Sequence, residues 1–183
     1  MDGILVAALG HGWLRDQAFG LKVVDALRRR SLPHDVELAD WSFGSITAFQ
    51  KLELGRYRRA IFVSGTQRDG RAPGTLARWS PPVDLPDGEE IHGRIGDCVM
   101  GAVSVDNLLI IAKFYGALPG DVVLVEAEPV DDTWGSDLSP ALAGLLEPAV
   151  DLVFAEIVRP DAGATYPTVS SAGSTPNGPH PVG

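Results

Sequence analysis

The sequence has little of three things that would each point to a class of protein: cysteine, positive charge and long apolar runs. Its single cysteine, Cys98, excludes an internal disulfide and any metal site built from several cysteines. Fifteen Lys and Arg stand against 24 Asp and Glu, and the net charge of −9 repels phosphate backbones and anionic lipid head groups. We therefore expect no nucleic-acid partner.

The opening segment MDGILVAALG has no basic region, and no apolar run in the sequence reaches membrane-spanning length. These two absences argue against a secretory signal and against membrane insertion. Together with the lone cysteine they predict a cytoplasmic protein.

What the sequence does contain is an alternation of apolar runs with helix patterns. Strands are predicted over residues 4–9, 34–40, 60–63, 75–79 and 121–127. Helices are predicted after Gln17, after Ser45, over residues 104–116 and from Ser139 onward. Continuous apolar strands between helices are typical of a mainly parallel sheet in an αβα sandwich.

Three further features divide the chain. Residues 80–98 are rich in proline, glycine and acids, and predict a long loop. Pro148 lies inside the last helix pattern and should kink that helix or divide it in two. After Val158 the composition becomes rich in proline, glycine, serine and threonine, so we expect one domain over residues 1–158 and a disordered tail over 159–183.

Parallel sheets bind ligands at the carboxyl ends of their strands, so the loops after Leu9, Val63 and Val125 should converge on a cleft. The first of these loops, LGHGWLRDQAFG, has neither a GxGxxG spacing nor a following GK[ST], which argues against nucleotide binding. A small-molecule binder would need such a phosphate-cradling loop. Ser64 lacks most of a GxSxG elbow, and Cys98 is more simply a buried residue than a nucleophile.

Four segments in collinear order resemble the hydrogenase maturation proteases, and the similarity spans about residues 3–157. The segments are ILVAALGHGWLRDQAFGLKVVDALRRR, YRRAIFVSG with APGT, VSVDNLLIIAKFYGALPGDVVLVEAEP, and LSPALAGLLEPAVDLVFAEI. The resemblance implies a twisted, five-stranded sheet flanked by helices. It also implies a nickel-recognising endopeptidase that trims the C-terminus of a NiFe hydrogenase large subunit.

Members of that family present three metal-contacting side chains: a glutamate or aspartate, an aspartate and a histidine. The resemblance lays these positions onto Gln17, Ser64 and Gly101. Two carboxylates and an imidazole would thus become an amide, a hydroxyl and a residue with no side chain. Amide and hydroxyl oxygens are weak neutral ligands, so the sequence predicts no bound metal.

We therefore interpret the chain as a non-catalytic relative that binds a hydrogenase subunit or an assembly factor. The side chains expected to line this binding region are His11, Trp13, Leu14, Asp16, Trp41 and Phe43. The aromatic ones could serve a protein interface if they are exposed, or pack on each other and close the cleft.

The enzymatic alternative is an active nickel-dependent endopeptidase with relocated ligands. Its candidate ligands are His11, Asp16, Glu126 and Glu128. Against that alternative, Asp16 could simply cap the following helix, and the two glutamates could be solvated.

Overall fold

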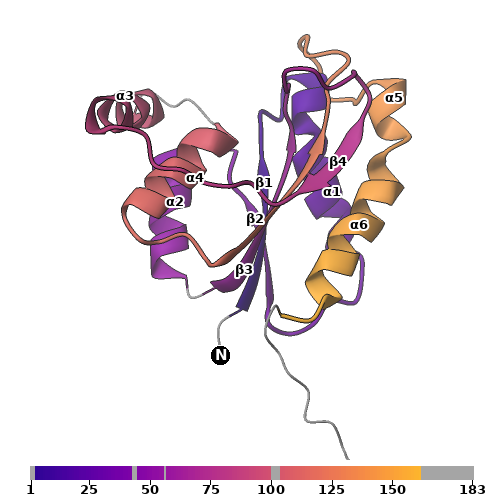
Figure 1. Ribbon diagram of the computed structural model, residues 1–183. Coiled ribbons are helices and arrows are strands. Elements are labelled where there is room, and N and C mark those ends of the chain that lie inside the picture. Colours follow the sequence, from indigo (N-terminus) through magenta and orange to yellow (C-terminus); the bar gives the residue numbers. More distant parts are fainter. Residues whose placement is uncertain (1–2, 43–44, 56, 100–103, 162–183) are drawn as a thin grey trace, which may run out of the picture.

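The computed structural model describes residues 3–42, 45–55, 57–99 and 104–161 (Figure 1). Its five-stranded sheet has the strand order β2-β1-β3-β5-β4. The strands are β1 (Gly3–Leu9), β2 (Val36–Asp40), β3 (Tyr57–Gly65), β4 (Leu76–Trp79) and β5 (Asp121–Ala127). Only β4, at one edge, runs antiparallel to its neighbour. The mainly parallel sheet predicted from the sequence is confirmed.

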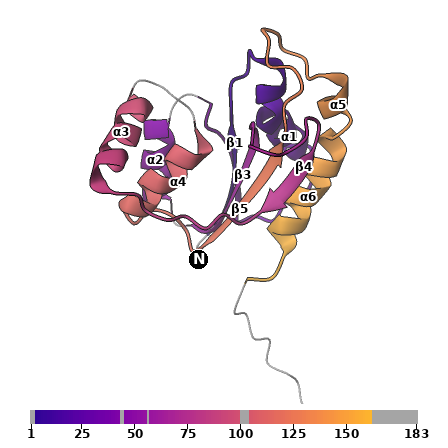
Figure 2. The same cartoon turned by 45° about the horizontal axis from the view of Figure 1, so that its top comes forward.

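Helices cover both faces of the sheet, which makes three layers (Figures 1 and 2). One face carries α1 (Phe19–Leu27), α5 (Pro140–Ala143) and α6 (Leu146–Val158). The other carries α2 (Ser45–Leu54) and α4 (Val105–Phe114), with α3 (Gly88–Val99) packed against both of them. A short 3-10 helix, η1 (Arg15–Ala18), leads into α1.

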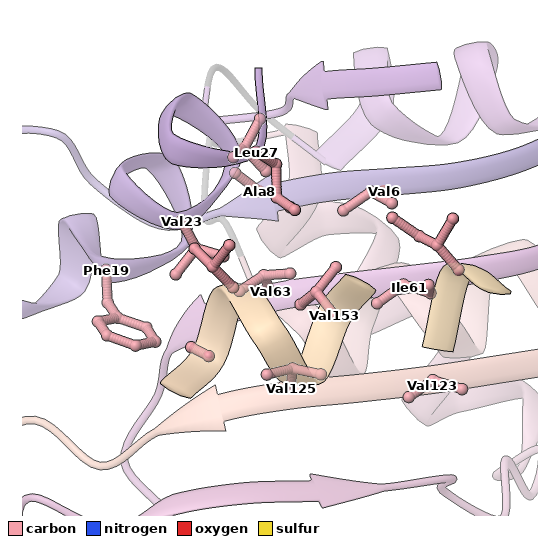
Figure 3. Close-up of a cluster of buried hydrophobic side chains, with 14 of the residues drawn as sticks. Val6, Ala8, Phe19, Val23, Leu27, Ile61, Val63, Val123, Val125 and Val153 are labelled. Carbon is pink, nitrogen blue, oxygen red and sulfur yellow. The ribbon is translucent and has the colours of Figure 1, made fainter. Parts of the chain in front are cut away.

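The core lies on both faces of the sheet because successive strand residues point to opposite sides. In β1, Val6 packs toward α1 and α6, whereas Leu5 packs toward α2 and α4. Figure 3 shows the first of these two clusters, in which strand valines meet Val23 of α1 and Val153 of α6. This two-sided burial is why β1 and the middle of β3 and of β5 are continuous apolar runs.

The expected long loop over residues 80–98 is wrong in its second half, where α3 forms. Asp87 caps this helix by accepting a hydrogen bond from the backbone N–H of Glu90 at 2.9 Å. Ile91 and Cys98 are buried, seven residues apart on one side of the helix. Its glycines gave the segment the composition of a loop, although the cap and the spacing of its apolar residues are those of a helix.

The predicted division of the last helix is confirmed, but the break lies before Pro148 rather than at it. A helical proline clashes with the carbonyl four residues earlier, and that residue is Gly144, where α5 has already ended. Ser139 caps α5 and Pro140 is its first residue, as expected.

Helix α6 ends at Val158, and most of the expected tail, residues 162–183, lies outside the described residues. In the part of the chain that the structure describes, no helix combines the length and the apolar character that a membrane span requires.

Candidate functional site

A small open pocket of about 220 Å³ lies at the carboxyl ends of β1 and β3. Its walls come from three segments that are far apart in the sequence: the loop after β1, the loop after β3 and the first turn of α4. The lining residues are Leu9, Gly10, His11, Gln17, Ser64, Gly65, Thr66, Gln67, Ser104, Val105 and Asp106. Gln17 and Ser64 therefore lie in one pocket, as the sequence reasoning required. Gly101 lies outside the described residues.

Glycines let the loop after β1 approach the ends of the strands this closely. A Cβ on Gly10 would lie 2.0 Å from the backbone oxygen of Gln17, and the φ of Gly10 is +137°. A Cβ on Gly20 would lie 2.1 Å from the backbone oxygen of Val63 at the end of β3. These glycines thus serve close packing between the loop, α1 and the sheet.

The side chains around the pocket are mostly neutral. Ser64 is buried, and its Oγ lies 2.7 Å from Oγ1 of Thr66. Gln17 is half-buried and His11 is exposed. The one carboxylate of the lining, Asp106, accepts two hydrogen bonds from Nη1 of Arg68, at 2.7 and 3.0 Å. The pocket therefore offers two amides, hydroxyls and one imidazole, beside a carboxylate that already has a cation.

Glu126 stands next to the pocket, because it is the register partner of Ser64 on the neighbouring strand β5. Its side chain is fully buried and accepts hydrogen bonds from Arg68 at 2.6 and 3.2 Å, from Arg71 at 3.0 Å and from the indole N–H of Trp79 at 2.9 Å. Burial alone would raise the pKa of Glu126, but these donors and charges hold it below its ordinary value. The guanidinium of Arg68 also lies 5.4 Å from the ring centre of Trp79.

Glu128 is buried as well, and both of its carboxylate oxygens lie 3.1 Å from the backbone nitrogen of Arg68. The expectation that Glu126 and Glu128 are solvated is therefore wrong. The physical reason is that β5 ends beneath the loop after β3, whose arginines and backbone N–H supply the partners that buried carboxylates require.

Asp16 is fully buried, but it does not face an open ligand site. One carboxylate oxygen accepts the backbone N–H groups of Val130 and Asp131, both at 2.9 Å, and the other accepts that of Ser139 at 2.7 Å. Burial would raise the pKa of Asp16, and these hydrogen bonds lower it below its ordinary value. The alternative in which Asp16 simply caps the following helix is wrong: no side-chain cap is present there, and Asp16 holds the loop after β5.

The nickel ion that the family resemblance implies does not fit these donors. Among the described residues, no group of three or more His, Cys, Asp or Glu side chains is placed to hold a metal ion. The candidate ligands of the enzymatic alternative are also divided in their contacts: Asp16 binds the loop after β5, while Glu126 and Glu128 bind the loop after β3. A divalent metal needs anionic or imidazole donors that converge on one point.

The aromatic residues singled out from the sequence have different environments. Trp13 is 70% exposed, whereas Trp41 is only 3% exposed and lies against Phe62, with ring centres 6.0 Å apart. Leu14 is half-buried, and Phe43 lies outside the described residues. Trp41 thus belongs to the core, and among the described members of this set Trp13 is the side chain that is largely available to a partner.

Sequence reasoning missed Arg68, Arg71 and Trp134. Two glutamates at alternate positions at the end of a buried strand require cationic or N–H partners, and this need was the signal for a nearby cation, although it did not single out Arg68 and Arg71 in the QRDGRAPG segment after β3. Trp134, which is 80% exposed, is the only large aromatic residue in an otherwise polar, acidic segment. Its isolation among polar and acidic residues was the sequence signal that could have identified Trp134 as a surface residue with a binding role.

Comparison with curated proteins found relatives among hydrogenase maturation factors, although no family model matches the chain. The hydrogenase expression/formation protein HupD of Thiocapsa roseopersicina is 25% identical over 182 residues, which cover 97% of this chain and 77% of that protein. The hydrogenase 2 maturation protease of Escherichia coli is 27% identical over 157 residues, covering 84% and 90% of the two chains.

Solved structures agree. The hydrogenase maturating endopeptidase HybD of Escherichia coli superimposes with a TM-score of 0.65 at 25% identity, over 85% of this chain and 91% of that one. The hydrogenase 2 maturation peptidase of a Thaumarchaeota archaeon gives a TM-score of 0.60 at 28% identity, over 86% and 99%. The resemblance to hydrogenase maturation proteases and the fold predicted from the sequence are confirmed.

Proposed function

We propose that this relative of the hydrogenase maturation proteases is a non-catalytic protein that binds a hydrogenase subunit or an assembly factor in the cytoplasm. The proposal contains two separable statements. One is that the chain holds no catalytic metal, and the other is that it retains a hydrogenase-related protein partner. Each has its own support and its own experiment.

The observation that carries the first statement is the position of Arg68 between two carboxylates. Asp106 lines the pocket and Glu126 is the strand neighbour of Ser64, and both accept hydrogen bonds from the same guanidinium. The chain's own cation therefore neutralises the carboxylate that lines the pocket and the carboxylate beside Ser64. Bringing a divalent ion beside this guanidinium would add repulsion between like charges in a partly desolvated place.

The side chains that occupy the family's ligand positions in this chain are weak metal donors. The amide of Gln17 and the hydroxyl of Ser64 carry no charge, so they cannot compensate for stripping water from a divalent ion. Without a metal, the pocket lacks the group that would polarise a peptide carbonyl or activate a water molecule for attack. These arguments support a protein that binds without cutting.

A titration of the purified chain with nickel, zinc and cadmium salts, followed by calorimetry, tests the first statement. We expect no stoichiometric binding at micromolar concentrations by the wild-type chain. Gln17→Glu combined with Ser64→Asp should gain measurable affinity, because it returns two anionic donors to one pocket. Tight 1:1 binding by the wild type that is lost in His11→Ala or Glu126→Gln, and kept in the control His34→Ala, would favour the enzymatic alternative.

Incubation with a purified hydrogenase large-subunit precursor tests the second statement. We expect the two chains to elute together in size-exclusion chromatography, with the mass of the precursor unchanged afterwards. A precursor shortened at its C-terminus in the presence of nickel would establish the endopeptidase instead. Failure to form any complex with large or small subunits or with their assembly factors would remove the hydrogenase link from the proposal.

A further inference from the structure

Two exposed tryptophans stand on neighbouring loops at the edge of the sheet where the strands end. Trp13 in the loop after β1 is 70% exposed, and Trp134 in the loop after β5 is 80% exposed. Val130 in the second loop is also exposed. We call these three residues the aromatic edge. Large apolar side chains that gather on a surface in this way mark places where a partner binds.

The two loops are joined, so the aromatic edge has a defined form before any partner arrives. Leu14 and Gly135 form a parallel bridge, which places Trp13 and Trp134 at equivalent positions one residue before it. The backbone N–H of Gly135 donates to the carbonyl of Trp13 at 3.0 Å, and that of Arg15 donates to the carbonyl of Gly135 at 3.1 Å. Figures 1 and 2 both show these loops side by side above α1 and α5.

Asp16 strengthens this junction from below. Its buried carboxylate holds the backbone of Val130, Asp131 and Ser139, which lie on both sides of Trp134 in the sequence. A surface that is ordered in advance loses less conformational entropy when it binds. The chain therefore keeps two tryptophans in water on a fixed support, instead of folding them into the core as it does with Trp41.

The charge beside the aromatic edge is negative. Asp132 and Asp137 are exposed, and neither has an ion-pair partner among the residues that the structure describes. Asp131 is matched by Arg15, with a nitrogen-to-oxygen distance of 3.4 Å. Indole rings attract cations over their faces, and carboxylates attract them directly. Both kinds of group at this edge therefore favour a positively charged ligand.

We propose that the aromatic edge docks a basic segment of a partner protein, in which Lys or Arg side chains alternate with apolar ones. Apolar residues of the segment pack on Trp13 and Trp134, while its cations meet Asp132, Asp137 and the indole faces. The inference deepens the proposed function, because it states the chemistry of the partner segment. It rests on the proposed function only in taking a hydrogenase subunit or an assembly factor as the protein that supplies this segment.

Fluorescence anisotropy with two pools of labelled 12-residue peptides tests this proposal. Both pools have Leu, Ile or Phe at half of their positions, and the other half holds Lys or Arg in one pool and Asp or Glu in the other. We expect the wild-type chain to bind the basic pool and not the acidic pool. Affinity for the basic pool should fall as salt concentration rises, because the exposed charges are screened.

Matched variants locate the binding. Trp13→Ala combined with Trp134→Ala should weaken binding at least about 30-fold, the size expected for the loss of one hot-spot tryptophan. Asp132→Asn combined with Asp137→Asn should weaken it roughly 5- to 10-fold, as expected for two exposed ion pairs. The controls are Phe114→Ala, another exposed aromatic residue on α4, and Glu53→Gln with Asp84→Asn, two exposed acids elsewhere. The controls should bind like the wild type.

In the peptide and sedimentation experiments, three results would overturn the inference: no binding of the basic pool, equal binding of both pools, or self-association that the tryptophan variant abolishes. The last result would mean that a second copy of the chain covers the edge. Complex formation with a hydrogenase subunit is measured separately. If that complex persists in the tryptophan variant, the docking inference fails and the proposed function stands. If the wild-type chain binds the basic peptides but forms no complex with any hydrogenase subunit or assembly factor, the docking inference stands and the proposed function fails.

Discussion

Asp16 and Glu126 are both carboxylates buried at the carboxyl edge of the same sheet, and they are satisfied in opposite ways. Asp16 receives three backbone N–H groups of the loop after β5. Glu126 receives two guanidinium groups and an indole N–H, all from side chains. The first arrangement holds the path of the chain, and the second neutralises charge beside the pocket. Buried acids in this fold are therefore not by themselves a sign of a ligand site.

The largest effect is expected from Asp16→Ala. It leaves three backbone donors without their acceptor, and an unsatisfied buried donor costs about 1–3 kcal/mol. Because water can reach part of the loop after the change, we expect a loss of about 3–5 kcal/mol in the free energy of unfolding, measured with urea. Asp132→Ala, an exposed acid of the same loop, is the control and should lie within about 0.5 kcal/mol of wild type. A small effect of Asp16→Ala would mean that the loop is held by other contacts.

Glu126→Gln should cost less, about 2–3 kcal/mol, because Arg68 keeps Asp106 as a partner and both arginines are partly exposed. A double-mutant cycle with Arg68→Met measures how strongly the pair is coupled. The double variant should be less destabilised than the sum of the two single changes, since the Arg68–Glu126 interaction that each single change breaks can be lost only once. Additive effects would show that Arg68 and Glu126 act independently.

The two carboxylates should also appear in the pH dependence of stability. Both have a pKa below its ordinary value in the folded chain, so each stabilises the fold fully above the unfolded pKa of about 4. That stabilisation is lost as the pH falls through the folded pKa. We expect the contribution of these two groups to the free energy of unfolding to be nearly constant between about pH 7 and pH 5 and to decrease below about pH 4.

The variants Asp16→Asn and Glu126→Gln separate the two contributions to this acid dependence. Each should flatten the decrease below about pH 4, because each removes one group that must otherwise be protonated. An unchanged slope in either variant would show that the residue does not titrate in this range and that other carboxylates, such as Glu156, account for the effect.

The architecture of this edge could be predicted from the sequence, whereas its side-chain partners could not. The apolar run over residues 4–9 and the valines of β5 indicate buried strands, because burial on both faces favours consecutive apolar residues over an alternating pattern. Gln17 and Ser64 were correctly expected in one region, since the ends of parallel strands meet at one edge. These features depend on local pattern and on topology.

The contacts of Asp16 and Arg68 depend on something else. Asp16 binds residues more than a hundred positions away, through backbone groups that every residue possesses, so no residue type marks them. Arg68 could have paired with any of several acids, and only the three-dimensional path of the loop after β3 selects Asp106 and Glu126. Helix α3 was missed for a different reason, because its glycines outweighed its cap and its buried spacing.

The smallest effect on stability is expected at the aromatic edge, although it is supported by Asp16. Trp13→Ala combined with Trp134→Ala should change the free energy of unfolding by no more than about 1 kcal/mol, because both side chains are mostly in water already. Trp41→Ala should instead cost about 3–5 kcal/mol, as expected for a buried tryptophan. Urea unfolding of the three proteins makes this comparison. A large loss in the double variant would mean that the tryptophans support the loops themselves, and their exposure would then need no partner to explain it.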